Sequence, residues 1–147
     1  MELIQNPVEV ALPIQADWYR SLWGERDIGA TLAESNDTRF VLESVARSDE
    51  GVDFRIRMRR DLDPYGGRLL SYDVFRDGGA KEINAHVGWW QYETKDGRWL
   101  MLMNRGTSFD GDDGFTMSVS GPELDRLADG FVARFSGLAL YQYQRKK

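Results

Sequence analysis

The chain has 147 residues, and none of them is cysteine. Without thiols there is no disulfide framework, no thiolate metal site and no cysteine nucleophile. Histidine occurs once, at His86, which excludes every site that needs two imidazoles. The range of catalytic and metal chemistry open to the chain is therefore narrow.

Long apolar runs are missing as well. The longest, Trp99–Met103, is far shorter than the ~20 residues of a membrane-spanning helix. The first twelve residues contain two acidic side chains, no basic one and Pro7, whereas a secretory signal starts with basic residues before its apolar stretch. We therefore expect a cytoplasmic protein without membrane insertion.

Recognisable catalytic motifs are absent too. The chain contains neither a glycine-rich phosphate-binding loop nor a serine nucleophile elbow. His86 could act as a general base oriented by Asp73 or Glu82, but its place on the polar side of a predicted strand favours an ordinary surface histidine. We predict no catalytic residue and no cofactor, and keep a carboxylate-dependent hydrolase as an alternative.

The densest acidic cluster consists of Asp110, Asp112 and Asp113. Carboxylates at this spacing can ligate calcium or magnesium. Glycine occupies positions 114 and 121, where a calcium loop needs ligands. We therefore predict a solvated loop without a bound metal.

Charge is distributed unevenly along a chain of net charge -5. Residues 1–50 carry ten acidic and four basic side chains, whereas residues 51–105 carry eight acidic and ten basic ones. An acidic chain argues against nucleic-acid binding, which favours a basic domain. The length predicts a single domain, 1–147.

Strict apolar–polar alternation over Val52–Arg59 predicts a strand with one buried and one wet face. Thr38–Arg47 is expected to pair with it in a hairpin, through a turn at Ser48–Gly51. The wet face carries Arg55, Arg57 and Arg59.

Other segments have strand patterns of their own. Strands are predicted over Leu69–Arg76, over Lys81–Val87 with a continuation to Glu93, and over Leu138–Gln144. Residues 24–37, 61–67 and 104–114 are expected to be irregular.

A hairpin is predicted at Asp96-Gly97, because this dipeptide suits the two-residue turn that needs positive φ at both positions. The predicted register sets Trp90, Tyr92 and Thr94 opposite Met103, Met101 and Trp99.

One helix is predicted near the C-terminus. Ser120 and Glu123 fit a capping box, and Leu127, Phe131 and Phe135 follow at helical spacing. A short N-terminal helix is expected near residues 17–23. The predicted fold is therefore α+β: a mostly antiparallel sheet of about seven to nine strands, open to strong curvature, with the C-terminal helix packed on one face.

Two segments resemble the Mog1/PsbP-like proteins. Val8–Pro13 followed by Trp18 resembles their opening strand, Leu-Pro and Trp. Phe115–Ser120, followed by Gly-Pro-Glu and a predicted helix with two phenylalanines, resembles their closing strand and helix. That family includes bacterial chaperones that hold secreted effectors and other non-enzymatic adaptors. The resemblance implies a protein-binding role and carries over no functional residue.

Aromatic side chains gather in two clusters, one around Trp18 and one between Trp89 and Trp99. Exposed Trp, Tyr and Arg are typical of protein-binding surfaces. We therefore predict a non-enzymatic adaptor, chaperone or immunity-type inhibitor that binds a protein such as a secreted effector or toxin, with its oligomeric state open. The predicted binding residues are Trp89, Trp90, Tyr92, Arg55, Arg57 and Arg59. The alternative is a small-molecule pocket lined by Trp and Met in a curved sheet or barrel.

Overall fold

The computed structural model describes residues 2–21, 23–60, 65–71, 73–75, 81–83, 90–100, 104–110 and 113–144. Antiparallel strands account for most of them, as the sequence predicts. In chain order the elements are β1 (Glu2–Ile14), the 3-10 turn η1 (Ala16–Trp18), β2 (Gly24–Ser35), β3 (Thr38–Ser48), β4 (Gly51–Arg60), β5 (Gly66–Ser71), β6 (Asp73–Phe75), β7 (Lys81–Ile83), β8 (Trp90–Thr94), β9 (Trp99–Leu100), β10 (Asn104–Asp110), β11 (Gly114–Ser120), α1 (Gly121–Leu124), the 3-10 turn η3 (Asp125–Leu127) and β12 (Phe131–Gln144).

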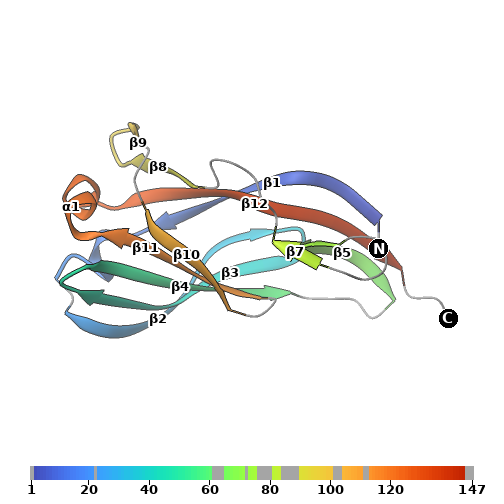
Figure 1. Ribbon diagram of the computed structural model, residues 1–147, viewed down its shortest axis with the longest axis horizontal. Coiled ribbons are helices and arrows are strands. Elements are labelled where there is room, and N and C mark those ends of the chain that lie inside the picture. Colours follow the sequence, from blue (N-terminus) through green and yellow to red (C-terminus); the bar gives the residue numbers. More distant parts are fainter. Residues whose placement is uncertain are drawn as a thin grey trace.

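The strands form two five-stranded antiparallel sheets and a small β6–β7 pair (Figure 1). The first, the β12 sheet, has the order β1-β12-β8-β9, with β5 also paired to β12. β1 pairs along most of β12, while β8 pairs with the first part of β12 and β5 with the last part. The second, the β4 sheet, has the order β10-β11-β4-β3-β2. Each sheet is thus organised about one central strand.

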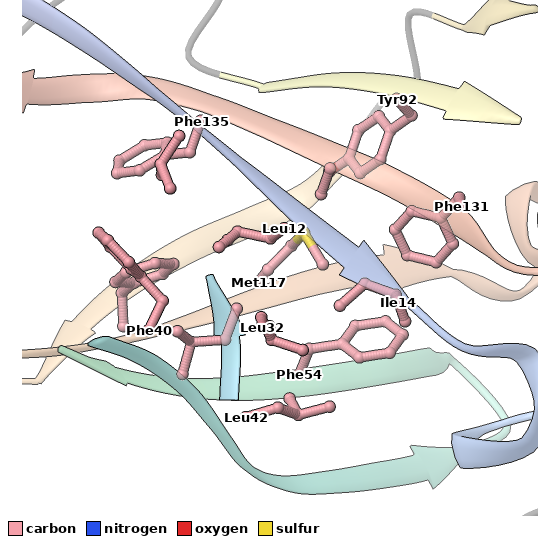
Figure 2. Close-up of a cluster of buried hydrophobic side chains, with 14 of the residues drawn as sticks. Leu12, Ile14, Leu32, Phe40, Leu42, Phe54, Tyr92, Met117, Phe131 and Phe135 are labelled. Carbon is pink, nitrogen blue, oxygen red and sulfur yellow. The ribbon is translucent and has the colours of Figure 1, made fainter. Parts of the chain in front are cut away.

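Side chains from the facing sides of the two sheets fill the space between them (Figure 2). Phe54 of β4 lies edge-on to Phe131 of β12, with ring centroids 5.8 Å apart, and Phe115 of β11 lies 5.3 Å from Phe135. All four rings are buried. Because apolar burial is the dominant favourable term in folding, this interior holds the sheets together and leaves their outward sides free for other roles.

Two crossover segments connect the sheets at one end. Residues 15–23 run from β1 to β2, and residues 121–130 run back from β11 to β12. The buried Tyr19 hydroxyl donates to the Leu127 carbonyl and accepts from the Gly130 N–H at 3.2 Å. Burial raises the pKa of Tyr19 to about 12. The two hydrogen bonds of this hydroxyl therefore join the β1–β2 crossover to the β11–β12 crossover.

The predicted hairpin of β3 and β4 is confirmed, with Ser48 opposite Gly51. The predicted alternation is confirmed as well, because Val52, Phe54, Ile56 and Met58 are all buried. Gly51 has a φ of 150°, and a Cβ there would collide with the Val119 carbonyl of β11. Only glycine allows β11 to approach the turn this closely.

The predicted C-terminal helix is wrong beyond its first turns. Only α1 and η3 are helical, and Gly130, with a φ of 92°, precedes the long strand β12. Phe131, Ala133 and Phe135 are buried while Val132 and Arg134 are half-buried, which is the period of a strand. Ser120 stands at the N-cap without a side-chain capping hydrogen bond, so the capping box does not form.

Two segments that were predicted to be irregular are strands. Residues 24–35 form β2 at the edge of the β4 sheet, and residues 104–110 form β10 at its other edge. β2 is interrupted by irregular pairing after Asp27 and after Thr31, and its first four residues are exposed. Bulges and charged residues are typical of edge strands, and they also remove the alternation from which a strand is recognised.

The hairpin at Asp96-Gly97 forms with a register one residue away from the prediction. Thr94 N–H donates to the Arg98 carbonyl at 2.8 Å, which leaves three residues in the loop, and Gly97 has a φ of 86°. Tyr92 consequently pairs with Leu100. Met101 and Met103 lie outside the described residues.

The predicted short N-terminal helix is reduced to the 3-10 turn at Ala16–Trp18. Within the described part of the chain, no helix is long and apolar enough to cross a membrane.

Candidate partner-binding face

The three arginines predicted from the alternation of β4 lie on the outward side of the β4 sheet. Arg55 and Arg59 are exposed, and Arg57 between them is half-buried. Arg39 of β3 is also exposed and pairs in register with Arg59. We call Arg39, Arg55, Arg57 and Arg59 the arginine face.

A bulge in β3 brings Arg39 into this face. Near the turn, β3 and β4 pair as Ser44 with Arg55, but beyond the bulge Leu42 pairs with Ile56, so Glu43 is the extra residue. Continued without the extra residue, the first register would set Arg39 opposite Arg60. The strand pattern of β4 therefore predicts three members of the face, and the bulge, which leaves no clear sequence signal, adds the fourth.

Arg57 is held between two carboxylates. Its guanidinium Nε donates to Glu43, and Nη1 donates to Asp113 Oδ1 at 2.9 Å. The hydrogen bond with Glu43 is the main cause that raises the pKa of Arg57. Because both carboxylates are partly exposed, this cluster contributes modestly to stability, but it fixes the position of Arg57.

The other three arginines of the face differ from most arginines of the protein. Among the described residues, Arg39, Arg55 and Arg59 make no ion pair or hydrogen bond through their side chains. Another eight arginines bond to a carboxylate, an amide oxygen or a backbone carbonyl: Arg20, Arg47, Arg57, Arg60, Arg68, Arg98, Arg126 and Arg134. The arginine face thus presents three exposed cations without a partner on the described surface, and Arg26 of β2 is a further exposed arginine of the same sheet.

Of the aromatic residues predicted to share this surface, Tyr92 lies elsewhere. Tyr92 is fully buried between the sheets, so its ring belongs to the core. Trp90 pairs with Phe135 in the β12 sheet, across the core from the arginines, and Trp89 lies outside the described residues. The structure brings the arginines together and does not join Tyr92 to them.

Trp23 is the exposed tryptophan of the described surface, with 67% of its area accessible. The Arg47 guanidinium lies 5.2 Å from its ring centroid. Arg47 also donates to the carbonyls of Tyr19 and Arg20, at 2.9 and 3.0 Å. Composition marks Trp23 as a candidate contact residue, but only the fold shows that it is exposed.

For most of the candidate metal and catalytic residues, the structure does not describe the side chain. His86 and Asp112 lie outside the described residues, whereas Asp113 is engaged by Arg57. Within the described part of the chain, no group of three or more His, Cys, Asp or Glu could hold a metal ion. Two surface grooves, of about 630 and 560 Å³, are lined by residues other than Trp and Met, so neither is the cavity of the alternative prediction.

No family model, curated protein or solved structure matches this chain. The resemblance to Mog1/PsbP-like proteins therefore stays a prediction.

Proposed function

We propose that the protein is a non-enzymatic binding protein, of the adaptor, chaperone or immunity type, that docks an acidic surface of a protein partner on its arginine face. The observation that carries the proposal is the set of three exposed arginines, Arg39, Arg55 and Arg59, without ion pairs among the described residues. They lie on two adjacent strands, β3 and β4, that pair directly in one sheet.

A shortage of carboxylates in the chain does not explain why these three arginines lack ion pairs. The chain has 24 acidic residues and only 19 Lys and Arg, and two carboxylates already flank Arg57. Interfaces are enriched in arginine, whose planar guanidinium binds a carboxylate through two parallel hydrogen bonds. A partner that supplies carboxylates would complete the pairing that the protein leaves open.

A protein partner suits the charge of the chain better than a nucleic acid does. The net charge is -5, and residues 1–50, which include β2 and β3 of the same sheet, carry ten of the acidic side chains. A phosphate backbone long enough to cover the sheet would meet this acidic surround. A local acidic patch on a protein can contact the arginines alone.

The test reverses charge on the face. The double variant Arg55→Glu/Arg59→Glu is compared with wild type and with Lys95→Glu/Arg98→Glu, which makes the same charge change at the β8–β9 turn of the other sheet. Each protein is immobilised and used to capture partners from a native extract, and the captured protein is then purified and titrated calorimetrically.

We expect the wild type and the β8–β9 variant to bind the purified partner alike, and the face variant to bind it about tenfold or more weakly, equivalent to ~1.4 kcal/mol. Charge reversal of acidic residues on the partner should restore binding to the face variant. Equal binding by all three folded proteins would contradict the proposal, and so would a captured partner that nuclease treatment releases.

A further inference from the structure

A groove lies at the end of the arginine face, where the β2–β3 turn meets the end of β4. Its volume is about 630 Å³. The residues that matter for its chemistry are Glu34, Asn36, Asp37, Arg39, Arg59 and Arg60. Arg55 is not among its lining residues, so the groove can be tested separately from the rest of the face.

Two arginines lie side by side in this groove, and no carboxylate of the described residues forms an ion pair with either of them. Arg39 and Arg59 are directly opposite in the β3–β4 ladder, and both are exposed. Like charges in this position repel each other and destabilise a sheet. Glu34 pairs in register with Arg39 on its other side, yet no ion pair joins Glu34 to either arginine within the described structure. The arrangement favours a ligand that supplies negative charge between the two guanidinium groups.

The walls of the groove are held in place by the fold. Arg60 Nε donates to the Leu70 carbonyl of β5 at 3.0 Å, which ties this end of β4 to the other sheet. The turn residues Asn36 and Asp37 have φ values of 49° and 59°, as a tight two-residue hairpin turn requires. Asn36 Oδ1 accepts from Arg68 Nη1 at 3.4 Å. A preformed site loses less entropy when a ligand binds.

We propose that the groove binds a phosphate-type dianion, held between Arg39 and Arg59. Each guanidinium can offer two parallel N–H groups to a pair of phosphate oxygens, and two cations match the charge of one dianion. Glu34 and Asp37 line the same groove and repel further negative charge. The site should therefore prefer a single phosphoryl group to a polyphosphate, and bind it with modest affinity. This inference does not depend on the proposed protein partner.

The test uses inorganic phosphate as the probe, titrated into the full chain at low ionic strength and followed by the NMR signals of the arginine Nε–H groups. We expect saturable shifts of the Arg39 and Arg59 signals. Arg39→Gln and Arg59→Gln should each weaken binding about tenfold or more. Arg55→Gln changes an exposed arginine four residues away on the same strand and should leave binding within about twofold. Glu34→Gln should strengthen binding, because it removes a competing negative charge.

A parallel titration with phenyl phosphate separates free phosphate from a phosphoryl group carried on a larger molecule. Tighter binding of the monoester supports the second source, and equal binding supports the first. Absence of saturation in the wild type, or equal weakening in the Arg55→Gln control, would overturn the inference. Neither result would affect the proposed function, which is judged by capture of a protein partner on the Arg55 and Arg59 face and not by phosphate binding.

Discussion

On the outward side of each sheet, an arginine of the central strand lies between two carboxylates. The two sheets differ in the number of other basic residues near that arginine. In the β12 sheet, Arg134 of the central strand reaches Glu9 of β1 and Glu93 of β8, at 3.4 Å each. In the β4 sheet, Arg57 of the central strand reaches Glu43 and Asp113 in the same way. Arg134 is the only basic residue of β12, whereas β4 has three more.

The difference separates two roles for arginine. An arginine between two carboxylates satisfies its neighbours and joins adjacent strands, and both sheets have one. The other cations of the arginine face, Arg39, Arg55 and Arg59, make no such contacts among the described residues. We infer that they serve recognition, and the following changes would break or sharpen that contrast.

The largest effect is expected where the two sheets should be equivalent, on their inner sides. Phe54→Ala in β4 and Phe135→Ala in β12 each remove a fully buried ring. Each should lower the free energy of unfolding by about 3–5 kcal/mol, because a cavity replaces the ring. Urea unfolding measures both. A loss below about 1 kcal/mol at one site would mean that the sheets do not share the core equally.

An intermediate effect is expected at Tyr19, which keeps the two sheets aligned. Tyr19→Phe removes the hydrogen bonds to Leu127 and Gly130 and should cost about 1–3 kcal/mol. Burial raises the pKa of Tyr19 from 10.0 to about 12, so the folded state keeps this proton at pH values where the unfolded state releases it.

The stabilisation linked to the Tyr19 proton is therefore complete below about pH 10 and falls as pH rises toward 12, by about 1.4 kcal/mol per pH unit. Urea unfolding of the wild type and of Tyr19→Phe from about pH 9 to about pH 11 measures it. The wild type should lose its advantage over the variant in the upper part of this range. A constant difference between the two would show that the hydroxyl is not protected in the folded state.

The smallest effect is the most specific, because its sign should differ between the sheets. Arg134→Gln leaves Glu9 and Glu93 without their shared cation and should lower stability by up to ~1 kcal/mol. Arg59→Glu replaces a repulsive pair with Arg39 by an attractive one and should raise stability by about 0.2–1 kcal/mol. Thermal unfolding at low ionic strength resolves the two signs. Destabilisation by Arg59→Glu would identify Arg59 as a structural residue.

The alternation of β4 was sufficient to predict its hairpin and its three arginines, since one face of a half-buried strand must be polar. The prediction of a long C-terminal helix was wrong for an equally physical reason. Leu127, Phe131 and Phe135 are spaced by four, and this spacing places residues on one side of both a helix and a strand. Residues 24–35 form an edge strand that the sequence pattern did not predict, because an edge strand does not need a regular apolar face.

The candidate site was predictable only as far as one strand reaches. Arg39 joins the face through pairing with β4, and that register depends on the extra residue Glu43. Tyr92 was predicted to bind a partner, but its strand lies in the other sheet with the ring turned into the core. Which strands become neighbours is decided by the packing of the whole chain, and the pattern within a single strand does not contain it.

The pairing of β1 with β12 has a consequence for the order of folding. Gly24 pairs with Arg47 inside the β2–β3 hairpin, whereas Glu2 pairs with Gln142. Long-range pairing costs more loop-closure entropy and slows folding. During synthesis, β2, β3 and β4 can pair as soon as they emerge, while β1 must wait for residues near the far end of the chain. The strands that carry the arginine face therefore meet first, and until β12 arrives their apolar side remains exposed to other molecules in the cell.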